Sequence, residues 1–552
     1  MNRRRIGNDN PRHWNPIMTD LILTCDDIIT LDPGRPAASA VAIAGGRVTA
    51  VGDRSDVRDW RDSRTEVIDL GGATLTPGLT DSHMHPAMGL NMTAGLDLSA
   101  CADLGAVRAA LRAAAETTGP GEWILGWGLD PNSFGAIPVG SAAVEDVLNG
   151  RPASLTLFDG HSVLASREAL RRAGIDGPRR FGSRSAIVCD ELGHPTGLLL
   201  EEGAMRLVRS VIPAEPFAAR RDRLAALLRD MAAAGLTGGH VMDLDDDALA
   251  LYEALDADGL LPLRLRLAPW RRPEDDDATV HELLALQGRS GRLWSVTAVK
   301  LFIDGTIDGG TAWLHEADCH GQSTHAYWQD PHDYTEAVRV LAQADVQTAT
   351  HAIGDAAVQH VLDALAKVVP ADSTVRHRIE HIETLPSDQV PRFAELGVVA
   401  SMQPSHATYY TRADHSDNWS RRLGDERADR AWRCRDLLEA GAVLTLGSDW
   451  PIAPFDPRGV MAAARLRRPA ERPDLGPVGP AQALTARQAL YGYTVAPALA
   501  ASAGHLGGRI AAGYRADLTA FAASPLSTPA ADLPGVPVTL TMVDGIIRHR
   551  AT

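Results

Sequence analysis

A His-x-His pair, His83 and His85, lies at the end of the predicted strand ATLTPGLTDSH. In an extended segment residues i and i+2 point to the same side, so both imidazoles could bind one metal ion. The spacing alone is weak evidence, because a chain with 19 histidines can contain such a pair by chance. A lone histidine at a strand end is more often a hydrogen-bonded imidazole than a ligand. However, His351, His381 and Asp449 also end apolar runs, and this combination favours a metal site.

Lys300 lies in the apolar run TAVKLFI, where burial should lower the pKa of its amine. A neutral amine can react with carbon dioxide, and the resulting carbamate could bridge two divalent cations. The alternative is a snorkelling or ion-paired lysine. We favour the carbamate, because Lys300 is one of two lysines in a chain that otherwise uses arginine, and it lies beside the proposed site.

The segments that would position these side chains are apolar strand-like runs. Along the chain they alternate with segments of helical period. Eight such runs predict an α/β fold with a (β/α)8 TIM-type barrel, whose functional residues lie at the carboxyl ends of the strands. The predicted strands are residues 73–83, 237–242, 262–268, 295–303, 346–351, 376–381, 398–403 and 443–449.

The segments before and after the predicted barrel, 77–503, have a different sequence pattern. Residues 19–76 and 504–552 contain short β-branched runs and the hairpin signals Gly45-Gly46 and Asp544-Gly545, which predict one small β-sandwich domain built from both chain ends. Residues 1–18 have neither pattern and are predicted to be a disordered tail. The gap after the first barrel strand is too long for one βα unit, so we expect an insertion at about 120–205 that covers the site, followed by a helix from Phe217 to Ala234.

Composition narrows the classes of function. Asp and Glu (70) outnumber Lys and Arg (54), and the formal net charge of −16 disfavours nucleic acid and anionic membrane surfaces as partners. The five cysteines form no Cys-x-x-Cys pair, which favours a reducing, cytoplasmic setting without disulfides. No apolar run is long enough to span a bilayer. The expected partner is a small molecule, and a homodimer is the working hypothesis for the oligomeric state.

Motifs along nearly the whole chain resemble those of the amidohydrolase superfamily, in particular the amidohydrolase-3 group, which includes N-substituted formamide deformylases. In order, they are TPGLTDSHMHP (76–86), DGHSVLASREALRRAGI (159–175), GHPTGLLLEEGA (193–204), VKLFIDGT (299–306), HAIGDAA (351–357), RHRIEHIE (376–383), GSDWP (447–451) and GYRADLTAF (513–521). One departure is DGHSVLAS, where Leu164 and Ser166 replace an aromatic residue and Asn that are frequent in the family. This departure affects inferences about the substrate and leaves the metal site unchanged.

The resemblance implies a role for each candidate ligand. His83 and His85 would bind a more buried metal ion, and His351 and His381 a more exposed one. Carboxylated Lys300 would bridge the two ions, most plausibly Zn²⁺. Asp449 would bind the first ion and act as the catalytic proton shuttle.

Six further residues are candidates for substrate binding. His161 in the insertion and Asp304 after Lys300 could contact a substrate carbonyl or amide, although a turn hydrogen bond is an equal alternative for each. His406 is placed to face a substrate, and three aromatic residues could line a pocket, although scattered aromatics more often belong to a core. These aromatic residues are Trp127, Trp313 and Trp450. Glu201 and Glu202 are interpreted as a solvated edge.

The predicted ligands indicate a metal-dependent hydrolase that cleaves a C–N bond of an amide or N-substituted formamide by means of a metal-bridging hydroxide. One alternative is a mononuclear deaminase on the same barrel, which would not need Lys300. Another is a catalytically silent metal-binding or regulatory protein on the same scaffold. Metal content distinguishes the three, with two, one or no ions expected per chain.

Overall fold

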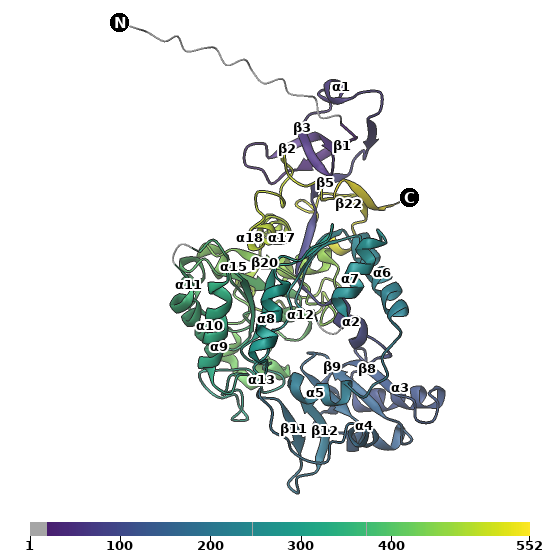
Figure 1. Cartoon of the computed structure of the whole chain (residues 1–552), viewed down its shortest axis with the longest axis vertical. Helices are drawn as coiled ribbons and strands as arrows, with labels where there is room; N and C mark the ends of the chain where they lie inside the picture. The colour runs from purple at the N-terminus through teal and green to yellow at the C-terminus, as the bar shows by residue number, and fades with distance from the viewer. Residues whose placement is uncertain (1–18, 245–246, 371–372, 552) are drawn as a thin grey trace.

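The computed structural model describes residues 19–244, 247–370 and 373–551. The predicted tail, 1–18, lies outside the described residues. Figure 1 shows three tiers: a sheet that contains strands from both chain ends, a central region of parallel strands and helices, and an inserted sheet on the opposite side.

Parallel strands in the central region form two sheets. One has the order β15–β14–β13–β6, with bounds Trp294–Val296, Arg264–Leu267, Leu236–Val241 and Leu79–Met84. The other has the order β16–β17–β18–β19–β20, with bounds Ala298–Phe302, Gln347–Ala352, Arg378–His381, Val399–Met402 and Leu444–Leu446. Most of these residues are buried, which explains why the strands appear in the sequence as near-continuous apolar runs.

The predicted strand 295–303 is divided between the two sheets. β15 ends at Val296 and pairs with β14, whereas β16 begins at Ala298 and pairs with β17. Isolated parallel bridges join the sheets at Trp270–Lys300 and at Met84–Trp450. The chain therefore has an α/β fold with the expected strands in sequence order, and a fully closed barrel stays a prediction.

Helices pack around the parallel strands. Helix α6, Phe217–Ala233, matches its predicted bounds to one residue, and it buries Leu224, Leu228 and Met231 at helical spacing. The other longer helices of this region are α7 (Ala248–Ala257), α8 (Asp277–Leu286), α9 (Pro331–Gln343), α10 (Asp355–Val368), α16 (Pro457–Leu466) and α17 (Ala486–Tyr493). Together the helices and strands enclose the largest hydrophobic core cluster of the described residues.

Strands from the two chain ends form one mixed sheet of eight strands, rather than the two separately hydrogen-bonded sheets of a sandwich. The order is β23–β22–β21–β5–β1–β2–β3, and β4 also pairs with β1. The bounds are β1 Leu21–Ile29, β2 Ala37–Ala44, β3 Arg47–Gly52, β4 Glu66–Asp69, β5 Thr74–Pro77, β21 Leu518–Phe521, β22 Val538–Val543 and β23 Ile546–Arg550. Alternating residues such as Leu21, Leu23 and Cys25 enter a separate core cluster.

The segment between β6 and β13 forms a third region with a sheet of its own. Its sheet has the order β11–β12–β10–β9–β8–β7, and helices α3 (Leu104–Thr117), α4 (Arg167–Arg172) and α5 (Glu201–Arg209) accompany it. The strands are β7 Leu96–Asp97, β8 Ile124–Leu129, β9 Ala153–Leu157, β10 Ser162–Ala165, β11 Ala186–Cys189 and β12 Pro195–Leu200.

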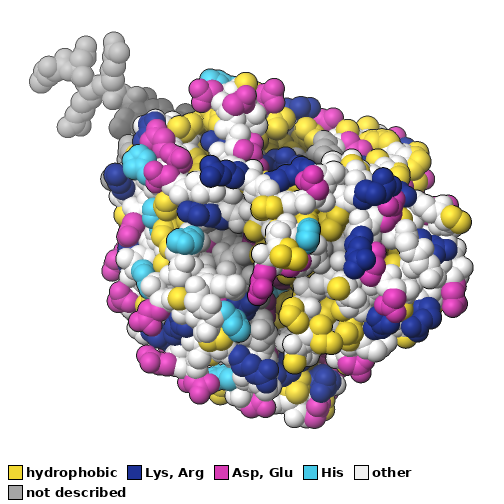
Figure 2. Space-filling view, turned by 90° about the horizontal axis from the view of Figure 1, so that it is seen from below, with side chains coloured by type: hydrophobic (Ala, Val, Ile, Leu, Met, Phe, Trp, Pro, Cys, Tyr) yellow, Lys and Arg dark blue, Asp and Glu magenta, His cyan; other side chains and the backbone are white. Residues whose placement is uncertain are grey.

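The surface carries charges of both signs. In the view from below in Figure 2, basic and acidic side chains are interspersed across the face. Within the described ranges, no helix combines the length and the apolar character that crossing a membrane requires.

Candidate metal centre

His83, His85 and Asp449 meet at the carboxyl ends of β6 and β20. The Nε2 atoms of His83 and His85 are 3.2 Å apart, and Asp449 Oδ1 lies 3.4 Å from the first and 3.1 Å from the second. The two chain segments are held by backbone hydrogen bonds, because the Asp449 amide donates to the His83 carbonyl at 2.7 Å. All three side chains are buried, so the structure places the sequence motif and Asp449 in one cluster.

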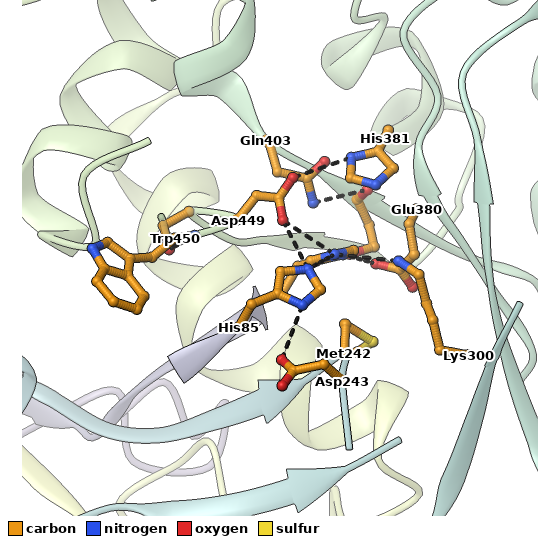
Figure 3. A network of polar contacts seen from close by, with 12 residues as sticks. His85, Met242, Asp243, Lys300, Glu380, His381, Gln403, Asp449 and Trp450 are labelled. Atoms are coloured by element: carbon orange, nitrogen blue, oxygen red, sulfur yellow. Dashed lines mark hydrogen bonds and ion pairs between the residues drawn. The ribbon is translucent and has the colours of Figure 1, made fainter. Parts of the chain in front are cut away.

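A second carboxylate orients each imidazole of the pair, as Figure 3 shows for His85 and Asp243. Glu380 Oε2 lies 2.7 Å from His83 Nδ1, and Asp243 Oδ1 lies 3.0 Å from His85 Nδ1. Since a carboxylate accepts hydrogen bonds, each Nδ1 carries a hydrogen and each Nε2 is left for a cation. Ligand atoms of a tetrahedral zinc ion stand about 3.3–3.4 Å apart. The donor types and their spacing therefore fit a metal ion.

The charges differ between the two histidines. Burial, together with nearby Lys300, lowers the pKa of His83 to about 4. Burial also opposes a proton on His85, but the carboxylates of Asp243 and Asp449 outweigh it and raise the pKa of His85 to about 9. Without metal, His85 carries a second proton, on Nε2, at neutral pH, whereas His83 is neutral. A metal ion that binds both Nε2 atoms must displace that proton.

A second group of donors shares Asp449. Its Oδ2 atom lies 3.8 Å from His381 Nδ1 and 3.6 Å from His406 Nε2. Both nitrogens are buried and have no hydrogen-bond partner among the described residues. The sequence predicted His406 as a substrate contact, whereas the geometry places it among the possible metal ligands of this part of the chain. Burial lowers the pKa of both imidazoles, which keeps them neutral and able to bind a cation.

Lys300 reaches the same cluster from β16. Its Nζ atom lies 3.3 Å from His83 Nε2 and 5.0 Å from the centre of the Phe302 ring. The residue is 1% exposed, and burial lowers the pKa of the amine to about 8. Lys300 is therefore a buried amine adjacent to the histidine pair.

His351 lies beside these groups without joining either. The centre of its ring is 4.5 Å from that of His381, but its Nε2 atom lies 3.1 Å from the Gly305 carbonyl oxygen. Among the described residues, the two clusters whose donor atoms lie within 4.8 Å of one another are His83–His85–Asp449 and His381–His406–Asp449.

Asp304 makes backbone contacts of the kind expected for a structural turn. Its carboxylate accepts hydrogen bonds from the amides of Trp313, Ile353 and Gly354 at 2.8–3.0 Å. Burial raises its pKa to about 7. Asp304 thus fixes the loops that follow β16 and β17, and it is completely buried.

The three predicted aromatic contacts line neither of the two cavities described below. Trp450 packs against Gly89 of helix α2 (Pro86–Met92), where an added Cβ would meet its ring at 2.2 Å. Trp313 lies against the ring of His360, and Trp127 belongs to β8 of the inserted sheet.

His161 and Glu201 bring the insertion into the site. His161 Nδ1 lies 2.9 Å from Glu201 Oε2, and Glu201 is 4% exposed. Glu202, which is 9% exposed, pairs with Arg206 and Arg209. The interpretation of Glu201 and Glu202 as a solvated edge is therefore wrong, because strand β12 and helix α5 pack this corner against the site.

Sequence reasoning missed the residues that support the histidine pair. Arg378 is completely buried and donates to Glu380, to Ser401 and to the Ser82 carbonyl. The available signal was the charged alternation in RHRIEH, because a buried strand can carry charges only if they are paired. Asp243 follows β13 without a comparable pattern.

Two cavities meet at the cluster. The larger one, about 350 Å³, extends from Lys300 towards the apolar side chains of Met88, Met92 and Met205. The smaller one, about 50 Å³, is lined by Glu383, His406, Tyr410, Trp419 and Trp432, among others. Asp449, His161 and His381 line both, so the metal-binding candidates stand where a large and a small chamber join.

Comparisons with known proteins find similarity along most of the chain. The model of the amidohydrolase family matches residues 66–549. The protein LONG AFTER FAR-RED 3 of Arabidopsis thaliana is 29% identical over 525 residues, which cover 91% of this chain and 87% of that protein. The N-substituted formamide deformylase of Arthrobacter pascens is 27% identical and covers 97% of this chain and 99% of its own. The crystal structure of an uncharacterized metal-dependent hydrolase from Pyrococcus horikoshii OT3 has a TM-score of 0.71 at 23% identity and covers 92% of this chain and 99% of that one.

Proposed function

Because this chain belongs to the amidohydrolase family and is a hydrolase that acts on carbon–nitrogen bonds, we propose that it cleaves an amide or an N-substituted formamide. The observation that carries the proposal is the convergence of four buried histidines on one carboxylate. Asp449 faces His83 and His85 through one oxygen and His381 and His406 through the other. Such a set at the junction of two cavities suits metal-assisted hydrolysis of a small molecule.

We propose that two divalent cations occupy the cluster. Zinc suits the imidazole and carboxylate donors best. The first ion would use His83, His85 and Asp449, and the second would use His381 with His351 or His406. Lys300, carboxylated by carbon dioxide with release of one proton, would supply the negative bridge between them. The bound cations would lower the pKa of a water molecule and polarise the substrate carbonyl.

Asp449 is the proposed catalytic residue, because among the described residues it is the carboxylate that both groups of histidines share. It would accept a proton from the attacking water and pass it to the nitrogen of the amide. The new C–O bond gives the carboxylate, and the broken C–N bond gives the protonated amine, so the two protons of the water end on the amine nitrogen. The histidines that flank Asp449 hold its pKa well below the usual range, against the effect of burial, so it starts the reaction as a base.

The cavities suggest an asymmetric substrate. The small chamber admits a few non-hydrogen atoms, since a single water needs roughly 10–15 Å³, whereas the larger one has room for an apolar group. One side of the scissile amide should therefore be small. A formyl group with a larger amine satisfies this condition.

The test combines metal analysis with a substrate screen. Protein loaded with zinc should contain two ions per chain by elemental analysis and should hydrolyse members of a panel of formyl and acetyl amides of apolar amines. One ion per chain with deamination of a heterocycle would favour the mononuclear alternative. A protein that retains no zinc after loading and hydrolyses no member of the panel would favour a catalytically silent scaffold.

A further inference from the structure

Arginines line the larger cavity, although the chain is acidic overall. The formal net charge of the chain is −16, and yet five arginines border this one cavity. They come from the end of helix α5, from the first two turns of helix α6 and from the loop after β14. The five are Arg209, Arg220, Arg223, Arg271 and Arg272.

Fewer carboxylates border the same cavity outside the metal centre. Four of the lining acids lie at the metal centre or contact its histidines and His161, namely Asp159, Glu201, Asp243 and Asp449. Within the described ranges, the other lining acids are Glu202 and Glu215, which pair with Arg209 and Arg223. Arginines therefore outnumber acids in this part of the lining, and such a surface attracts anions.

Two of the arginines have acid partners that lie outside the cavity lining. Arg220 pairs with Asp247, and Arg271 pairs with Asp275 at 3.6 Å. Neither aspartate lines the cavity, whereas both arginines do. Each pair thus presents its guanidinium to the cavity and keeps its carboxylate behind it.

An aromatic wall leads from the metal centre to Arg272. The ring centre of Phe302 lies 5.0 Å from Lys300 Nζ, and the ring of Trp270 packs edge-on against Phe302 at 4.8 Å. The guanidinium carbon of Arg272 lies 5.2 Å from the centre of the Trp270 ring. All four residues line the larger cavity. A flat apolar group that leaves the metal centre along this wall would therefore end beside a guanidinium.

Hydrogen bonds fix the wall to the strands of the site. The Arg271 amide donates to the Lys300 carbonyl at 2.9 Å, and Trp270 Nε1 donates to the Met242 carbonyl at 2.6 Å. The loop that carries Arg272 is thus connected to the strand that carries Lys300. A guanidinium that stacks on an indole keeps the edge of its plane for hydrogen bonds, and this edge matches two oxygens of a carboxylate or a phosphate.

We propose that the larger part of the substrate carries an anionic group, a carboxylate or a phosphate, which Arg272 binds at the end of the aromatic wall. This inference rests on the proposed amide hydrolysis, and it narrows the substrates to amides of amines with a flat apolar body and an acidic end. Because the contact is the same in the bound substrate and in the transition state, it should lower KM and leave kcat unchanged. Hydrogen bonds to a charged group change affinity by about 10–100-fold.

The first test compares matched substrates on full-length, zinc-loaded protein. N-formyl-2-phenylethylamine is the neutral probe, and the same amide with a carboxylate or a phosphate at the para position of the ring gives two anionic probes. KM should be about 10–100-fold lower for an anionic probe than for the neutral one, with a similar kcat. The difference should shrink as the salt concentration rises. The anionic probe with the lower KM identifies the acidic group.

Variants of Arg272 test the assignment of the residue. R272Q should raise KM for the anionic probe by about 10–100-fold and leave KM for the neutral probe unchanged. R272K keeps the charge but not the planar fork, so it should retain part of the preference. The matched control is R289Q, between β14 and β15, whose guanidinium pairs with Glu253 outside the cavity lining. It should match the parent protein with every probe, and all variants should bind the same amount of zinc.

A binding measurement separates this inference from catalysis. By calorimetry, 2-phenylethylamine with a para carboxylate should bind the parent protein more tightly than 2-phenylethylamine itself, and R272Q should remove the difference. If the parent hydrolyses formyl amides without preferring an anionic probe, or if R272Q leaves the preference intact, the inference is wrong. If the parent hydrolyses no amide, the proposed function is wrong, and calorimetry alone decides whether Arg272 binds an anion.

Discussion

The chemistry of single residues centres on Asp449, whose two oxygens face different pairs of histidines. This arrangement follows from the φ of 59° at Asp449, which turns the chain sharply after β20. The side chain is thereby aimed across the ends of the strands rather than along its own strand. One carboxylate can then serve both as a ligand and as a proton carrier.

Replacement of Asp449 by Asn separates these two roles. Asn keeps an oxygen for a metal ion but cannot accept and return a proton. We expect turnover to fall to background at every pH while part of the zinc is retained, as measured by stopped assays and elemental analysis. A zinc-loaded D449N variant with a kcat like that of the parent would exclude Asp449 as the shuttle.

The proposed bridge can be tested by replacing Lys300, and Lys367, the other lysine in the chain, supplies a matched control. K300A should lose one of two zinc ions and nearly all activity, since no anionic bridge would offset repulsion between the ions. K300R should not restore either, because a guanidinium stays protonated. The control K367A removes an exposed lysine on α10 and should keep two ions. Two bound ions in an active K300A variant would contradict the bridge.

At the scale of elements, β18 lines the site through His381 and supports it through Arg378 and Glu380. Arg378 and Glu380 are two residues apart and point the same way, so the arginine is paired with the acid that holds His83. Both are completely buried. Removal of one partner leaves a buried charge, which costs roughly 3–5 kcal/mol.

We therefore expect R378M to lower the free energy of unfolding by about 3–5 kcal/mol and to weaken zinc binding through the freed Glu380. Urea unfolding and zinc titration would measure the two effects. The control R376M acts at a partly exposed arginine just before the same strand and should change both by little. A stable R378M variant with normal zinc affinity would show that Glu380 does not need its partner.

The elements explain what the sequence could and could not predict. Apolar runs located the parallel strands, because burial on both faces leaves few polar residues, and His83, His85 and Asp449 followed from their places at strand ends. The break at Thr297 was missed, since the run from Trp294 to Phe302 is apolar on both sides of it. The pairs Glu380–His83 and Asp243–His85 depend on which strands lie opposite one another, and local spacing does not contain that information.

At the scale of the whole molecule, the sheet made from both chain ends is anchored to the central region. Thr519 and Thr541 donate to the carbonyls of Gly235 and Ala232, which end helix α6 and lead into β13. Arg264 of β14 pairs with Asp517 at 2.9 Å. The end of the chain therefore contributes contacts to the strands that carry the site as well as to its own sheet.

Truncation at Gly504 tests this connection. It would remove β21, β22 and β23, leave one edge of β5 without its partner, and expose part of the core of that sheet. We expect insoluble protein, measured as the soluble fraction after expression at low temperature. A soluble, zinc-binding truncation would show that the central region folds without the last strands.

The position of β21 between β5 and β22 also has a consequence for synthesis. On the ribosome the chain emerges from its N-terminus, so β5 leaves the exit tunnel hundreds of residues before its partner β21 exists. Throughout that interval the unpaired edge of β5 can form hydrogen bonds with other nascent chains on the same messenger RNA. We therefore expect the yield of folded protein to depend on keeping this edge apart from other chains until β21 has been made.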